Sequence, residues 1–207
     1  MSSRILELLG PVRVIPVLTI TDAADAVPLA KALVQGGLTV LEVTFRTDAA
    51  QEAIRRIVGE VPEATVGAGT VTQPQHFAEA EWVGAKFAVS PGTTGRLLTA
   101  AASSSLAYLP AAVTASEAMA LAEQGYTHLK FFPARASGGT DALAQLAAPL
   151  PNVSFCPTGG LDQENAADYL ASGNVFAVGG SWPAPARLIA AKDWDGIAAL
   201  ARTATAL

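Results

Sequence analysis

The sequence is poor in cysteine and lacks a long uninterrupted apolar run. Cys156 is the only cysteine in the chain, so no disulfide can form within it, which fits a reducing compartment. Residues 1–20 contain no basic segment ahead of an apolar core, and Pro11 and Pro16 interrupt them. We therefore expect neither a signal peptide nor a membrane span, and we expect a cytoplasmic protein.

Charge is also scarce, since charged residues make up 15% of the chain and hydrophobic residues 51%. The formal net charge is −5 and no basic block stands out, which argues against nucleic acid as a partner. The two histidines, His76 and His128, are not spaced as a metal-binding pair, and Cys156 has no companion ligand. A carboxylate-only magnesium site stays open, but no pattern requires a metal.

Short apolar runs alternate with longer alanine-rich stretches of helical period. Eight runs are predicted to be strands: 14–20, 39–45, 65–69, 86–90, 106–110, 128–132, 152–157 and 175–179. We therefore predict an α/β fold in which residues 1–207 form a single-domain (β/α)₈ TIM barrel of minimal size. A doubly wound open sheet is the alternative, but no glycine-rich turn follows the first run.

Several helix boundaries carry recognisable signals. Asp22 is a predicted N-cap for the first helix, and either Thr47 or Asp48 for the second. Thr114 is followed three residues later by Glu117, a spacing that predicts a capping box.

The second strand places ionisable side chains near its carboxyl end, where barrels of this type carry their active sites. Residues two apart in a strand share a face, so Glu42 and Arg46 point away from the apolar Leu41 and Val43. We expect the polar face to line the barrel interior. A structural ion pair is the alternative, although ionisable groups at this end of a strand favour a functional site.

Lys130 stands inside the apolar run 128-HLKFFP-133, although lysine is rarely buried without a partner. If its side chain points inward, it lies close to Glu42 and Arg46. Burial and a neighbouring cation both favour the neutral amine, the form that attacks a carbonyl carbon. The alternative is a lysine that only pairs with a barrel carboxylate. Lys86 is the rival nucleophile, but it opens its strand at the opposite end.

The last two strands end in glycine pairs beside a hydroxyl, 157-PTGG-160 and 179-GGSW-182. Glycines let backbone N–H groups approach an anion, and the hydroxyl adds a donor. The loops after the seventh and eighth strands are a frequent phosphate site in this fold. The two motifs together predict a phosphate-binding pocket.

Six motifs, in order along nearly the whole chain, resemble the 2-keto-3-deoxy-6-phosphogluconate (KDPG) aldolases. They are 42-EVTFR-46, 67-GAGTV-71, 88-AVSPG-92, 129-LKFFPA-134, 155-FCPTGG-160 and 178-VGGSW-182. The resemblance implies a class I aldolase, a lyase that uses a lysine imine and no metal or other cofactor. It also implies cleavage of KDPG to pyruvate and glyceraldehyde 3-phosphate, and a homotrimer. Some members of the family cleave 4-hydroxy-2-oxoglutarate (KHG).

Carried over by position, the resemblance implies two catalytic residues: Lys130, which forms the imine, and Glu42, which shuttles protons. It implies substrate contacts from Arg46 and Thr70 at the pyruvate carboxylate, Phe132 and Pro91 around the pyruvate portion, Thr158 at the hydroxylated part, and Gly159, Gly160, Gly179, Gly180 and Ser181 at the phosphate. The family often has a glycine where this chain has Ala111, a departure that bears on substrate range.

Several alternatives stay open. A galactonate-type aldolase would differ in stereochemistry at C4, and Thr158 favours the gluconate type. The same imine could assist decarboxylation of oxaloacetate as a side activity. A phosphosugar isomerase or epimerase would use Glu42 and the phosphate loops but would leave Lys130 unexplained. A phosphate-binding module without turnover would bind ligand without forming an imine.

Overall fold

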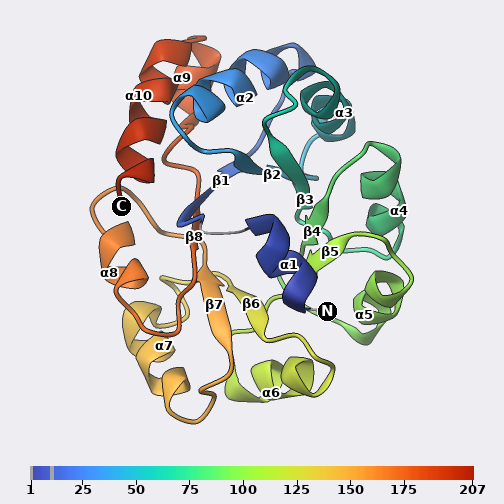
Figure 1. The fold of residues 1–207 in the computed structure, drawn as a ribbon, viewed down its shortest axis with the longest axis vertical. Helices are drawn as coiled ribbons and strands as arrows, with labels where there is room; N and C mark the ends of the chain where they lie inside the picture. The colour runs from blue at the N-terminus through green and yellow to red at the C-terminus, as the bar shows by residue number, and fades with distance from the viewer. Residues whose placement is uncertain (1, 10–11) are drawn as a thin grey trace.

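A computed structural model describes residues 2–9 and 12–207, and within them eight parallel strands alternate with helices (Figure 1). The strands are β1 (Val14–Leu18), β2 (Val40–Thr44), β3 (Thr65–Gly69), β4 (Phe87–Val89), β5 (Ala107–Leu109), β6 (His128–Phe131), β7 (Ser154–Pro157) and β8 (Val178–Gly180). Seven of the predicted runs each contain a whole strand, and the eighth overlaps β8, which ends one residue past the run at Gly180. The α/β class with parallel strands is therefore confirmed.

The strands are hydrogen-bonded in two ladders. One has the order β5-β4-β3-β2-β1-β8, and the other pairs β6 with β7. Isolated parallel bridges connect them, Ala111 with Lys130 on one side, and Phe155 with Val175 and Thr158 with Gly179 on the other. Lys130 and Glu42 consequently belong to different ladders.

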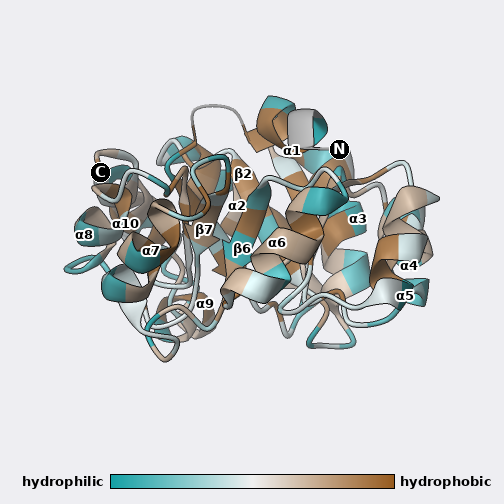
Figure 2. Cartoon of the chain, turned by 90° about the horizontal axis from the view of Figure 1, so that it is seen from below, coloured by the Kyte–Doolittle hydropathy of each residue, from teal (hydrophilic) through white to brown (hydrophobic). Residues whose placement is uncertain are grey.

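The helices surround the strands (Figure 1). Among the described residues they are α1 (Ser2–Leu9), the 3₁₀ helix η1 (Ala23–Asp25), α2 (Ala26–Gln35), α3 (Ala50–Glu60), α4 (Gln75–Trp82), α5 (Gly95–Ala102), α6 (Ala115–Glu123), α7 (Gly139–Ala147), α8 (Ala166–Leu170), α9 (Ala186–Ala190) and α10 (Trp194–Thr205). Helices such as α6 and α7 carry hydrophobic and hydrophilic residues together, as expected for helices with one face on a sheet (Figure 2).

Two hydrophobic clusters lie on opposite sides of the strands. Leu41 and Val43 belong to the larger cluster, which the helices share. Val40 belongs to a smaller cluster that the strands enclose, together with Phe87 and Leu109. The alternation predicted for β2 is therefore confirmed, and the face that carries Glu42 points inward.

Helix α1, which no sequence pattern had predicted, contributes to the inner cluster. Its Ile5 and Leu9 are buried there against side chains from the strands. The helix contacts β5 and β6 and lies in front of the strands in Figure 1. Lys86, just ahead of β4, lines a surface hollow with Arg4 and Glu7 of α1. Lys86 thus lies at the amino-terminal end of the strands, as predicted.

The predicted helix caps have mixed outcomes. The Asp22 carboxylate accepts from the Ala24 N–H, but it caps η1, which precedes α2. The capping box of Thr114 and Glu117 is confirmed. The prediction of a Thr47 or Asp48 cap was wrong, because α3 starts at Ala50 without a side-chain cap.

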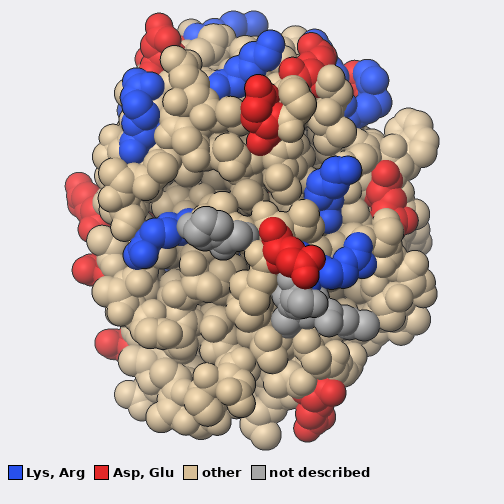
Figure 3. Space-filling view, viewed as in Figure 1, with Lys and Arg blue, Asp and Glu red and all other residues tan. Residues whose placement is uncertain are grey.

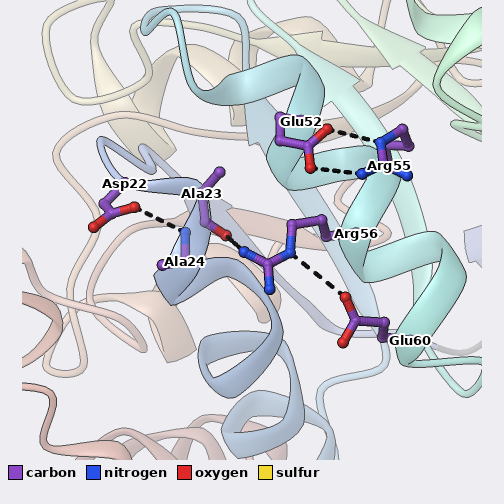
Figure 4. Close-up of polar contacts among 7 residues, drawn as sticks. All are labelled: Asp22, Ala23, Ala24, Glu52, Arg55, Arg56 and Glu60. Carbon is purple, nitrogen blue, oxygen red and sulfur yellow. Dashed lines mark hydrogen bonds and ion pairs between the residues drawn. The ribbon is translucent and has the colours of Figure 1, made fainter.

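Arg56 of α3 forms a hydrogen bond to η1, in the segment that follows β1 (Figure 4). Its Nη1 donates to the Ala23 carbonyl over 2.9 Å, and its Nε lies 3.5 Å from Glu60 Oε1. Arg55 forms a two-pronged pair with Glu52 one turn away. Exposed ion pairs contribute at most about 1 kcal/mol to stability. The hydrogen bond from Arg56 to the backbone of η1 therefore does more than these pairs to position the segment between β1 and α2.

Candidate active site

A buried ion pair occupies the space enclosed by the strands. Lys130 Nζ lies 2.9 Å from Glu42 Oε1 and 3.1 Å from Oε2, and the two residues are 5% and 4% exposed. The two residues predicted to be catalytic are therefore in direct contact, one from β6 and one from β2. The distance alone fits a structural pair as well as an acid–base pair, so the surroundings decide the chemistry.

The carboxylate of Glu42 lies against the backbone of Gly69 in β3. A Cβ added to Gly69 would lie 2.3 Å from Glu42 Oε1 and 2.6 Å from its Cγ. Real Cβ atoms do not approach so closely, so the present position of Glu42 requires glycine at 69. The Phe132 ring lies next to the other partner of the pair, with its centroid 5.8 Å from Lys130 Nζ.

Cys156 of β7 is fully buried in the inner cluster. Burial raises the pKa of its thiol to about 12; the Lys130 charge opposes that shift and the Glu42 charge adds to it. A thiol with this pKa stays protonated at neutral pH, so Cys156 is not a nucleophile.

Arg46 and Thr70, predicted to share a ligand carboxylate, are also in contact. Arg46 Nε donates to Thr70 Oγ1 over 2.9 Å. Thr70 has φ +59°, a left-handed conformation that costs a non-glycine residue about 1–2 kcal/mol. Backbone strain of this kind is concentrated at functional sites, and here it presents the hydroxyl to the guanidinium.

A cleft of about 190 Å³ opens at the carboxyl ends of the strands. Seven of the predicted substrate-binding residues line it: Arg46, Phe132, Thr158, Gly159, Gly160, Gly180 and Ser181. Its wall contains left-handed glycines, Gly159 at φ +97° and Gly160 at φ +78°, which suit a close backbone approach. The cleft therefore joins the guanidinium of Arg46 to the two glycine-rich turns.

The other predicted contacts lie outside this lining. Thr70 accepts a hydrogen bond from Arg46 but does not line the cleft, and Pro91 is half-buried just after β4. Gly179 packs against Thr158, since an added Cβ would lie 2.3 Å from Thr158 Oγ1.

Three lining residues were missed, namely Val17, Thr19 and Leu161. Val17 and Thr19 could have been found, because they alternate with the inward-facing Ile15. Leu161 follows a turn and has no comparable periodic signal.

The described residues contain no group of three or more histidine, cysteine, aspartate or glutamate side chains placed to hold a metal ion. None of the described helices has the length and apolar character needed to cross a membrane.

Comparison with known proteins points to one family. A family model described as KDPG and KHG aldolase matches residues 5–200. The 2-dehydro-3-deoxy-phosphogluconate aldolase of Pseudoalteromonas atlantica is 51% identical over 95% of this chain and 91% of its own. A Legionella pneumophila KDPG aldolase, solved with pyruvate captured as a covalent carbinolamine, superposes with a TM-score of 0.93 at 41% identity, covering 96% of both chains. The Zymomonas mobilis ZM4 enzyme, solved with 3-phosphoglycerate, gives 0.92 at 43% identity, covering 100% of this chain and 97% of the other.

Proposed function

Because the chain belongs to the family of KDPG and KHG aldolases, we propose that it cleaves KDPG to pyruvate and glyceraldehyde 3-phosphate through an imine on Lys130. The protein is an aldolase, and hence a lyase. The observation that carries the mechanism is the buried contact between Lys130 and Glu42, next to the Phe132 ring, which lines the cleft. A purely structural pair would not need a cleft beside it that ends in phosphate-type turns.

Imine formation requires the neutral amine. Across the 2.9 Å contact, Glu42 takes a proton from the Lys130 ammonium. The amine then attacks C2 of the substrate, and a proton passes from the attacking nitrogen to the former carbonyl oxygen to give the carbinolamine. Glu42 returns its proton to the departing hydroxyl, water leaves, and a protonated imine remains with Glu42 ionised again.

The protonated imine withdraws electrons from the neighbouring carbon–carbon bond. Glu42 removes the proton of the C4 hydroxyl, the C3–C4 bond breaks, and its electron pair forms the enamine while the aldehyde leaves. Glu42 then protonates C3, and water releases pyruvate from Lys130. A positioned acid–base group of this kind contributes about 10²–10⁴-fold to a rate.

The remaining site residues bind the two ends of the substrate. Arg46 and Thr70 hold the C1 carboxylate, while Phe132 and Pro91 pack around the pyruvate portion. Thr158 contacts the hydroxylated part. The phosphate binds in the pocket of Gly159, Gly160, Gly179, Gly180 and Ser181. The contact of Arg46 with Thr70 and the glycine-rich lining of the cleft support these assignments.

We further propose that residues 1–207 form one closed (β/α)₈ barrel. The bridges at Ala111–Lys130 and Thr158–Gly179, which connect the two ladders on either side, support closure. We also propose a homotrimer, as in the family that the chain resembles. We propose a cytoplasmic location as well, because the single cysteine is a free thiol, which fits a reducing compartment.

Catalysis is proposed to need no metal or other cofactor, because the imine itself is the electron sink. Dialysis of the enzyme against a chelator should leave kcat/KM for KDPG unchanged within about 2-fold, whereas a metal-dependent aldolase loses nearly all activity. Restoration of lost activity by a divalent cation would contradict the proposal.

Borohydride trapping tests the proposed imine. The protein is reduced in the presence of pyruvate and digested, and the adduct is located by mass spectrometry. We expect the adduct on the peptide that contains Lys130, in the wild type and in Lys86→Ala but not in Lys130→Ala. An adduct on Lys86, or none, would exclude the imine at Lys130 and favour an isomerase or a binding module.

A further inference from the structure

The hydroxyl of Thr19 occupies a central place in the cleft that the proposed mechanism does not use. Thr19 follows β1, which lies between β8 and β2 in the sheet. Within the cleft lining, Ser181 follows β8 and Arg46 follows β2. Thr19 is therefore flanked by the proposed phosphate pocket on one side and the proposed carboxylate site on the other.

The hydrogen bonds of Thr19 determine what its oxygen can offer a ligand. Thr44 Oγ1, which is completely buried, donates to the Leu18 carbonyl over 3.0 Å. The same oxygen lies 3.1 Å from Thr19 Oγ1. A hydroxyl has one proton, so both contacts can be hydrogen bonds only if Thr19 donates to Thr44. The lone pairs of Thr19 are then left to face the cleft.

Thr158 provides a contrast on the far side of β8. Its hydroxyl reaches the Cys156 carbonyl only over 3.4 Å, at the long limit of hydrogen bonding. Its proton is weakly held and can turn toward a ligand. The proton of Thr19 is held in a shorter hydrogen bond to the buried Thr44. Thr19 is therefore less free than Thr158 to donate to a ligand and is better suited to accept a hydrogen bond from one.

We propose that Thr19 is a specificity-determining residue whose oxygen accepts a hydrogen bond from a substrate hydroxyl between the carboxylate and phosphate ends. If the proposed function holds, that hydroxyl is the one on C5 of KDPG. The C4 hydroxyl gives its proton to Glu42 during cleavage, which leaves the C5 hydroxyl as the donor in that stretch of the substrate. A substrate without this donor leaves the Thr19 oxygen unpaired, which a hydrogen-bonding site penalises.

Two aldehydes that differ only in this hydroxyl test the proposal in the direction of synthesis. Pyruvate is condensed with glyceraldehyde 3-phosphate, whose hydroxyl becomes that of C5, or with 3-oxopropyl phosphate, which lacks it. The measured quantity is the ratio of kcat/KM for the two aldehydes. The wild type should prefer the hydroxylated one, and Thr19→Val should lower the ratio by about 10-fold, as expected for one lost hydrogen bond.

Two further variants separate the hydroxyl from the shape of the side chain. Thr19→Ser keeps the donor and acceptor and should keep the wild-type ratio. Thr44→Val removes the acceptor for the Thr19 proton with little change in volume, and it should lower the ratio too, because Thr19 can then turn its proton toward the cleft. A ratio unchanged in Thr19→Val, or lowered equally in Thr19→Ser, would overturn the proposal.

Pyruvate trapping on each variant distinguishes this inference from the proposed function beneath it. If the wild type traps no pyruvate on Lys130, the aldolase mechanism fails. If trapping is normal in the wild type and in Thr19→Val but the aldehyde ratio is unaffected, only the role of Thr19 fails. Thermal melting of each variant shows whether it is folded under the assay conditions.

Discussion

The position of Glu42 depends on a neighbouring residue that has no side chain. Gly69 lies so close to the carboxylate that no Cβ fits between them. The glycine paired with Glu42 in β3 is Gly67, and the Phe87 ring already fills the space beside it, 2.2 Å from where a Cβ would lie. Gly69 and the carboxylate therefore act as a matched pair.

Gly69→Ala should displace the Glu42 carboxylate from Lys130 and lower kcat for KDPG cleavage by about 10²-fold, the lower range for a lost proton-transfer group. Steady-state kinetics measure the loss, and the rate of borohydride trapping shows whether imine formation slows with it. Gly59→Ala is the matched control, because an added Cβ there meets nothing within 4 Å. Normal kcat in Gly69→Ala would show that Glu42 tolerates the methyl group.

At this scale the sequence predicted which side chains point inward, because the alternation of residues along a strand places each side chain on one face or the other. It placed Glu42 and Lys130 together and separated Lys130 from Lys86. It missed Thr19, although parity with Ile15 would have indicated an inward side chain. The contact between Thr19 and Thr44 could not be predicted from the alternation of residues along a strand, because it depends on the register between two strands.

Among the elements, α6 is held at its start by a complete capping box. Glu117 Oε2 accepts from the N–H groups of Val113 and Thr114, each over 2.9 Å. The backbone N–H of Glu117 donates in return to Thr114 Oγ1. The bond from Val113 is the largest cause that lowers the pKa of Glu117 below its ordinary value of 4.5, with burial opposing it and the bonds from Thr114 adding to it.

The lowered pKa gives this cap a predictable pH dependence. Because the folded protein holds the ionised form of Glu117 more strongly than the unfolded chain does, the stabilisation is present in full above about pH 5. It declines as the pH falls below the ordinary value of 4.5 and through the lower folded pKa. Glu117→Gln should therefore be less stable than wild type at pH 7, with the difference shrinking toward pH 3.

Urea denaturation at several pH values measures the difference, with Glu123→Gln at the other end of α6 as control. An equal loss of stability at every pH would show that the carboxylate charge has no part in the cap.

Local sequence predicted this cap but not the start of α3. In α6 both partners belong to the same four residues, so local spacing is sufficient. Near α3 the Thr47 hydroxyl donates instead to the Ile20 carbonyl, after β1. The Thr47 side chain, which the local pattern had predicted to cap α3, is instead hydrogen-bonded to a backbone carbonyl that lies far away in the sequence.

The molecule as a whole is closed at one end by α1. The face that carries α1 shows positive and negative side chains interspersed, with broad areas of neither (Figure 3). Ile5 and Leu9 turn inward from this helix and complete the inner cluster. Sequence periodicity could not reveal the helix's role, because the surface it covers is assembled from strands scattered along the chain.

Ile5→Ala should destabilise the protein by about 2–4 kcal/mol, because it leaves a cavity in the inner cluster. Leu6→Ala is the control on the same helix, since Leu6 is 39% exposed. Denaturant titration gives both values, and the kcat of the folded protein should not change, because the cleft lies at the other end of the strands. A loss no larger than that of Leu6→Ala would mean that α1 does not seal the interior.

The ion pair also bridges the two strand ladders, since Lys130 belongs to the β6–β7 pair and Glu42 to the six-stranded ladder. The contact proposed to be catalytic therefore exists only when both ladders are in place. During refolding from denaturant, aldolase activity should therefore not recover ahead of far-UV circular dichroism, because secondary structure within one ladder is not enough to form the pair. With its proposed catalytic role, the ion pair would make turnover a direct readout of whether the two ladders have joined.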